Sequence, residues 1–155
     1  MRSREESVGV TSNSSVIDRR LAYGVLRLTM GVNILIHGAG RLFGPGAGAF
    51  AAQTGSEFTG TALPQSLVHA FLSALPVGET TLGIIITLGL FTRWALMLGG
   101  LLIAALVFGT ALRSDWTTVG IQMIYAITYY FLLANVVDDY FSLDNLLRRR
   151  LNPSV

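Results

Sequence analysis

Residues 21–39 read LAYGVLRLTMGVNILIHGA, an apolar run that carries an arginine, an asparagine and a histidine. Its length is close to the roughly 20 residues that a helix needs to cross a bilayer. Charged and polar side chains are costly in hydrocarbon and therefore mark a hypothesis for a functional site. The stretch predicts a membrane helix with a polar face.

The composition of the whole chain is that of a membrane protein. Of its 155 residues, 52% are hydrophobic and only 13% are charged, a balance that a polar shell around a soluble core does not have. The absence of cysteine excludes disulfides, thiol relays, iron–sulfur clusters and Cys-ligated zinc. All basic residues are arginines and most lie near the chain ends, which indicates a lipid bilayer as partner and excludes nucleic acid.

Three further apolar runs predict three more spans, so the expected fold is an all-α bundle of four transmembrane helices. The spans fall at about residues 21–39, 67–91, 94–112 and 119–137. Residues 1–20 are polar and predict a disordered cytoplasmic tail before the membrane domain at 21–137. Residues 138–155 predict an amphipathic cytoplasmic segment in which Ser142 caps a helix.

The connection between the first two spans is long, and the third span is rich in small residues. Residues 40–66 predict an exterior loop with a short interfacial helix from Ala49 to Phe58 that could act as a lid. Small residues at four-residue spacing let membrane helices pack closely. The third span has two such pairs, Gly100 with Ala104 and Ala105 with Gly109.

The placement of arginine predicts the topology. Arg41 and Arg113 fall on one side of the predicted bundle. Eight arginines fall on the other side, at positions 2, 4, 19, 20, 93, 148, 149 and 150. By the positive-inside rule, both termini are expected in the cytoplasm.

The first span has a polar stripe, which we expect to face protein. At 100° per residue, its members share an arc of about 120°: Tyr23, Arg27, Met30, Asn33 and His37. Counted from the predicted ends, Arg27 lies ~10 Å and Glu79 ~18 Å from the cytoplasmic face. We therefore expect Arg27 and Glu79 to form an ion pair. The pair could belong to a functional site, or it could have a purely structural role. Alternatively, Arg27 could extend its side chain to the lipid headgroups.

The fourth span supplies a second polar face, formed by Gln122, Tyr125 and Tyr129 at i, i+3 and i+7. Mid-span hydroxyls need partners, so this face is expected to turn toward Glu79 and close a polar pocket. The alternative is that these groups hydrogen-bond between helices with no cavity. His37 and His69 fall at similar predicted depth, yet with no supporting motif we expect neither haem nor a metal site.

These features resemble the DoxX/DoxD family of small membrane proteins. The matching phrases are Arg27-x-x-x-Gly31, His37-Gly38-x-x-Arg41-Leu42, FTGTALPQSLV (58–68), Glu79-x-x-x-Gly83, GLFTR (89–93) and YFSLD (140–144). Many family members carry lysine at the position of Arg41. The resemblance implies a four-helix bundle in a bacterial or archaeal cytoplasmic membrane. For DoxD it implies the membrane subunit of a thiosulfate:quinone oxidoreductase, whereas some distant relatives resemble cargo receptors or chaperones.

The functional hypothesis is the membrane subunit of a quinone-linked oxidoreductase with a partner subunit. Glu79 would relay protons, His37 or a tyrosine would hydrogen-bond a quinone carbonyl, and Arg27 would stabilise the reduced anion. The expected catalytic residues are Glu79 and His37, and the expected ligand-binding residues are Arg27, Asn33, Gln122, Tyr125 and Tyr129. The alternative is a non-catalytic scaffold or chaperone-like accessory subunit. Catalysis itself, the electron donor, the quinone type and a homo-oligomeric state stay open.

Overall fold

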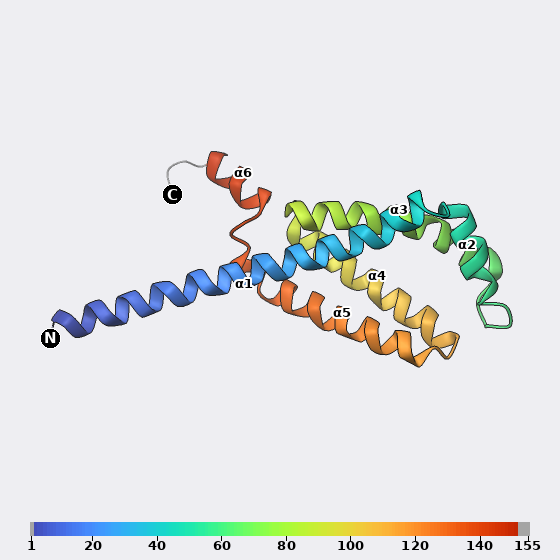
Figure 1. The fold of residues 1–155 in the computed structure, drawn as a ribbon, viewed down its shortest axis with the longest axis horizontal. Helices are drawn as coiled ribbons and strands as arrows, with labels where there is room; N and C mark the ends of the chain where they lie inside the picture. Colours follow the sequence, from blue (N-terminus) through green and yellow to red (C-terminus); the bar gives the residue numbers. More distant parts are fainter. Residues whose placement is uncertain (1, 152–155) are drawn as a thin grey trace.

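The computed structural model describes residues 2–151, and the side chains of residues 14–151. Every regular element in that part of the chain is a helix (Figure 1). The elements are α1 (Arg2–Phe43), α2 (Ala47–Ser56), α3 (Gln65–Leu88), α4 (Thr92–Leu112), α5 (Trp116–Ala134), the 3-10 helix η1 (Val136–Asp138) and α6 (Leu143–Leu151).

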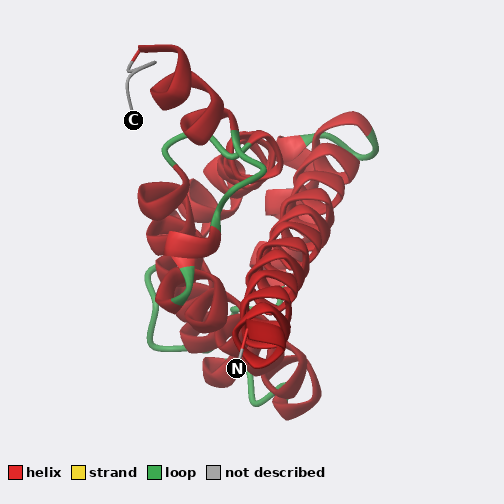
Figure 2. Ribbon diagram, turned by 90° about the vertical axis from the view of Figure 1, so that its left-hand side faces the viewer, coloured by secondary structure: helices red, strands yellow, loops and turns green. Residues whose placement is uncertain are grey.

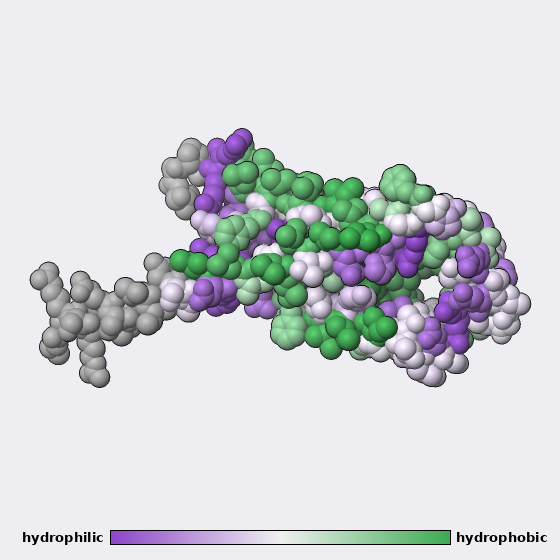
Figure 3. Space-filling model, in the orientation of Figure 1, coloured by the Kyte–Doolittle hydropathy of each residue, from purple (hydrophilic) through white to green (hydrophobic). Residues whose placement is uncertain are grey.

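Four of these helices are long and apolar enough to cross a membrane, namely α3, α4, α5 and the part of α1 from Ser14 to Phe43. Their outer surfaces are apolar, with Ile36, Leu101 and Ile124 each at least 60% exposed. Hydrophobic side chains cover much of the middle of the molecule, and hydrophilic ones gather around α2 and α6 (Figure 3). The predicted all-α bundle of four membrane helices is confirmed.

The bundle consists of two antiparallel helix pairs. The most extensive contacts join α1 to α3 and α4 to α5, and α2 packs on α3 (Figures 1 and 2). Contacts between the pairs are far fewer. The start of α1, the α3–α4 turn and α6 lie at one end, which we call the terminal end; α2 and the α4–α5 turn lie at the other, the α2 end.

α1 runs from Arg2 to Phe43 and so includes most of the segment for which the sequence predicts a disordered tail. The segment before Leu21 contains no proline, so nothing interrupts the helix there. The last residues of this segment also contact the chain that follows α5. Arg19 pairs with Asp138 at 2.9 Å, and the Arg20 guanidinium lies 4.7 Å from the Tyr140 ring centre.

The short elements agree with the sequence. The predicted interfacial helix is α2, and the Asn145 amide donates to Ser142 Oγ at the start of α6, as expected for a cap. α3 ends at Gly89, whose φ of 68° suits glycine. Asp115 caps α5, and its pKa is lowered by hydrogen bonds from the Thr118 hydroxyl and amide. The predicted C-terminal segment beyond Leu151 lies outside the described residues.

Glycines bring the backbones of α1 and α3 into direct contact. A Cβ at Gly31 would lie 2.7 Å from the Thr87 nitrogen, and one at Gly83 would lie 2.5 Å from Leu35 Cα. A Cβ at Gly38 would collide with the Thr80 amide. Residues 31, 35 and 38 of α1 therefore face residues 87, 83 and 80 of α3. Only glycine permits this separation.

The contact between α4 and α5 uses a glycine that the predicted small-residue pairs did not include. A Cβ at Gly99 would lie 2.5 Å from the ring of Tyr129, whereas one at Gly100 would lie 3.7 Å from Tyr129 Cβ. Gly109 faces Phe58 instead of α5. The large ring of Tyr129 on α5 occupies the space that the missing side chain of Gly99 leaves on α4, which we call the notch. The two helices therefore pack a large residue against a small one here.

Replacing Gly38 by alanine should separate α1 from α3 and lower the free energy of unfolding by about 1–3 kcal/mol, the usual cost of overpacking. Gly78→Ala is the matched control, because a Cβ at Gly78 meets nothing within 4 Å, and it should be neutral or stabilising by up to about 1 kcal/mol. Denaturant titration in mixed micelles measures both values. Equal effects of the two substitutions would refute backbone contact at Gly38.

Candidate functional site

A cavity of about 180 Å³, which we call the inner cavity, lies between the two helix pairs. Seven of its lining residues are polar or aromatic: Asn33, His37 and Arg41 from α1, Glu79 from α3, and Thr118, Gln122 and Tyr125 from α5. Apolar side chains such as Met30 and Ile103 complete the wall. The structure thus brings five of the seven predicted site residues to one cavity, and leaves Arg27 and Tyr129 outside it.

Glu79 pairs with Arg41, so the expected Arg27–Glu79 ion pair is wrong. Glu79 is 3% exposed, and the Arg41 side chain remains 29% exposed. The packing register explains the difference. Gly31 already faces Thr87, eight residues or ~12 Å of helix from Glu79, and Arg27 lies a further turn away. Because α1 continues past the predicted end at Ala39, Arg41 is placed within reach of Glu79 instead.

Sequence reasoning therefore missed Arg41 as a site residue. The signal was its spacing, since Arg41 follows His37 by four residues and so shares its helix face. His37 Nδ1 lies 3.0 Å from the backbone oxygen of Asn33, and the imidazole is exposed. When Nδ1 donates this hydrogen bond, Nε2 is left to accept one.

Gln122 ties α5 to α4 and carries an unused acceptor. Its Nε2 donates to Thr110 Oγ1 at 3.0 Å. Its Oε1 is buried and has no hydrogen-bond partner among the described residues. A buried polar atom of this kind is costly unless another molecule satisfies it.

Tyr129 does not form the cavity wall that its spacing predicted. It is 3% exposed and packs into the notch at Gly99. Seven residues place Tyr129 on nearly the same face of α5 as Gln122 but about two turns nearer the terminal end, where it meets Gly99 of α4 instead of the cavity. Tyr129 is thus a core residue, and the polar wall of α5 is formed by Thr118, Gln122 and Tyr125.

Arg27 closes the terminal end of the bundle, where it neither lines the inner cavity nor snorkels to the surface. It is 3% exposed. Its guanidinium donates to the carbonyls of Ile86, Thr87 (3.0 Å) and Phe141 (2.8 Å), and its Nε lies 3.1 Å from Asp139 Oδ1. These contacts cap the carbonyl end of α3 and fasten the segment after α5 to α1.

Asp144 completes this network from α6. Its carboxylate accepts hydrogen bonds from the Phe91 and Thr92 amides, each at 2.9 Å, at the start of α4. Its own amide donates to the Gly89 carbonyl at 3.0 Å. The phrases GLFTR (89–93) and YFSLD (140–144) are therefore in contact.

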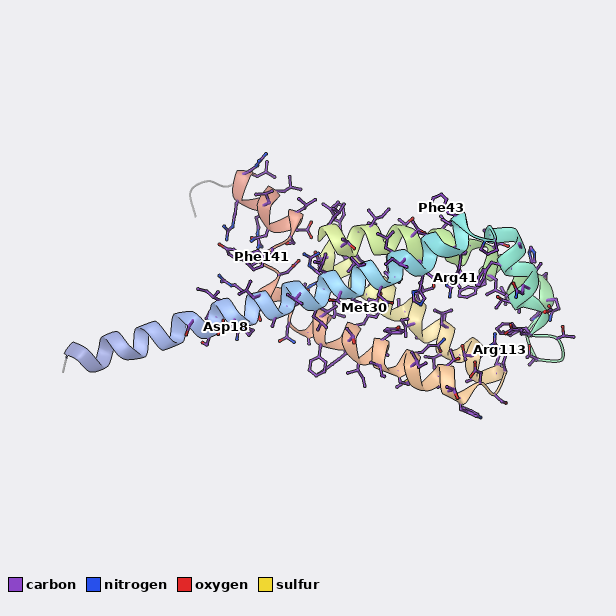
Figure 4. The ribbon with its side chains drawn as sticks, in the orientation of Figure 1. Asp18, Met30, Arg41, Phe43, Arg113 and Phe141 are labelled. Carbon is purple, nitrogen blue, oxygen red and sulfur yellow. The ribbon has the colours of Figure 1, made fainter. Side chains whose placement is uncertain are left out.

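A second cavity of about 350 Å³, the outer cavity, adjoins the inner one toward the α2 end. Arg41, Leu106, Thr118 and Gln122 line both cavities. Arg113 also lines the outer cavity, pairs with Glu57 and lies 5.3 Å from the Phe58 ring centre. Figure 4 shows Arg41 and Arg113 at this end, from two different helix pairs.

The described side chains contain no group of three or more His, Asp or Glu residues placed to hold a metal ion. His69, the second histidine, contacts Ser73 Oγ at 3.5 Å on its own helix. The linings of the two cavities present hydrogen-bond donors and acceptors, the Arg41–Glu79 ion pair and the Arg113 guanidinium.

Arg27→Gln should lower the free energy of unfolding by about 3–5 kcal/mol, because it leaves Asp139 buried without a countercharge. Arg27→Lys should recover little, since an ammonium cannot reproduce the guanidinium fork that reaches three carbonyls. Arg93→Gln, an exposed change at the same end, serves as control and should cost less than about 0.5 kcal/mol. Unfolding in mixed micelles tests this, and equal values for Arg27→Gln and Arg93→Gln would contradict it.

Comparison with known proteins gives one match. The DoxX family model matches residues 22–112, more than half of the chain, and this range includes Arg41 and Glu79 but ends before Gln122. No curated protein and no solved structure matches the chain. The sequence match and the four apolar helices lead to one conclusion: the chain belongs to the DoxX family of membrane proteins.

Proposed function

We propose that this DoxX protein binds a quinone in the inner cavity, as the membrane subunit of a quinone-linked oxidoreductase. The observation that carries the proposal is the buried Glu79–Arg41 pair, which shares a cavity with Asn33, His37 and Gln122. Reduction of a quinone takes up two electrons and two protons. A carboxyl group that lines the cavity is a suitable proton relay.

The donors and acceptors of the cavity suit a quinone ring. The free Gln122 Oε1 would accept a hydrogen bond from a quinol hydroxyl. His37, with one ring nitrogen not engaged with Asn33, would hydrogen-bond a second ring oxygen. Arg41 replaces Arg27 as the cation that would stabilise negative charge on the ring. The inner and outer cavities together fall in the usual range for ligand sites, about 300–1,000 Å³.

The proposal includes a partner protein in the membrane. The chain has no cysteine and therefore no thiol-based redox group, so electrons would come from another subunit. The start of α1 and the whole of α6 lie at one end of the bundle (Figure 1). With the excess of arginine there, we place this end on the cytoplasmic side of a bacterial or archaeal membrane.

A non-catalytic scaffold is the second candidate, and a specific observation favours it. Arg27 is fully engaged by its own chain, and Glu79 and Arg41 neutralise each other. Buried ion pairs of this kind can serve mainly to fix helix register. In that case the exposed Arg148, Arg149 and Arg150 of α6 would be available to dock a partner.

Glu79→Gln should keep the fold and lower quinol formation by about 10²–10⁴-fold, the usual contribution of a proton-transfer group. Quinol formation is measured in membranes that contain the partner subunit. Asp18→Asn removes an equally charged, exposed group that lines neither cavity and should leave the rate unchanged. The Arg41→Gln, Glu79→Gln double variant checks that an unpaired Arg41 is not the cause of any loss of folding.

Quinone content decides between the two candidates. A lipid extract of the purified wild-type protein should contain quinone at a stoichiometric level, and Arg41→Gln should reduce it. A quinone-free extract together with unchanged turnover of Glu79→Gln would favour the scaffold.

A further inference from the structure

The two cavities differ in chemistry and are neighbours that share part of their lining. The inner cavity gathers the polar groups around Glu79, whereas the outer cavity is walled mainly by apolar side chains of α3 and α4, including Leu72, Leu75 and Phe108. Four residues line both, and Gln122 with its unused Oε1 is one of them. A molecule that reaches both cavities would meet polar groups at one end and hydrocarbon along the rest.

The outer cavity lies where α3 and α4 diverge. The two helices are close at their connecting turn and separate toward the α2 end (Figure 1). Three large apolar residues of the cavity lining are also exposed on the outer surface: Leu67 at 57%, Phe71 at 37% and Phe108 at 58%. Because α3 and α4 are long and apolar enough to cross a membrane, we expect these exposed side chains to face lipid. The seam between α3 and α4 therefore connects the outer cavity with the hydrocarbon of the bilayer.

Access from water at the α2 end is obstructed. Phe58, which follows α2, is 8% exposed and lines the outer cavity together with Thr54. Arg113 holds this segment by its ion pair with Glu57 and its contact with the Phe58 ring. Because Phe58 and its neighbours lie over the outer cavity at the α2 end, the seam between α3 and α4 is the candidate route of entry.

We propose that the ligand is an amphiphile with a polar ring and a long hydrocarbon tail, which enters from the bilayer between α3 and α4. The ring occupies the inner cavity beside Gln122 and Glu79, and the tail lies in the outer cavity and leaves through the seam. This inference rests on the proposed function and specifies its substrate class as a tailed, lipid-soluble quinone. A water-soluble ring without a tail would use only the inner cavity.

Two adjacent alanines of α4 provide a matched test. Ala105 lines the outer cavity, whereas its neighbour Ala104, which is also exposed, does not. Ala105→Trp should fill the tail space and weaken binding of a decyl-substituted benzoquinone by at least about tenfold, a typical steric penalty. The same ring without the tail should bind Ala105→Trp and wild type within about twofold. Ala104→Trp should match wild type for both probes. Binding is measured in nanodiscs by chromatographic quantification of bound quinone.

The outcomes separate this inference from the proposed function. If wild type binds neither probe, both proposals fail. If wild type binds both probes, and Ala105→Trp affects neither or weakens them equally, the tail path is wrong while the quinone site stands. Should Ala105→Trp fail to fold, a decyl quinone with a diazirine at the tail end is photolysed on wild type. Labelling of Leu67–Leu75 or Ala105–Gly109 supports the path, and labelling elsewhere overturns it.

Discussion

The backbones of α1 and α3 lie in contact at Gly31, Gly38 and Gly83, and the position of almost every other group depends on this contact. No side chain separates the helices there, so their register cannot shift by a turn without a clash. The register brings Arg41 to Glu79 and sends Arg27 past the end of α3. Arg27 and Glu79, which their predicted depths would pair, therefore lie in different parts of the bundle and have different partners.

At the terminal end, buried charge organises the segment that follows α5. Arg27 joins the last carbonyls of α3 to Asp139 and Phe141, while Asp144 caps the start of α4. In hydrocarbon, backbone groups without partners are costly. A single guanidinium satisfies three carbonyls here, which explains why the chain after α5 returns to the α3–α4 turn.

The α2 end is built differently, because the two helix pairs share few contacts and leave room between them. Polar groups from α1, α3 and α5 meet in the inner cavity, and apolar groups of α3 and α4 surround the outer one. Arg41 and Arg113 each contact a phenylalanine in or just after α2, at Phe50 and Phe58. The same two arginines therefore line the cavities and hold α2 and the residues just after it against them.

The sequence by itself determined the four apolar spans, the short helix after the first span, the cap at Ser142 and the family, because length, hydropathy and local hydrogen bonding are properties of neighbouring residues. It also indicated five residues that meet in one cavity, through their spacing on single helices. Only the tertiary structure decided that Arg41 pairs with Glu79, that Arg27 closes the terminal end and that Tyr129 fills the notch at Gly99. Which side chains on different helices become partners depends on the register between the helices and on the glycines that let their backbones touch. Both depend on how two helix surfaces pack together, and the sequence pattern of one helix does not contain that information.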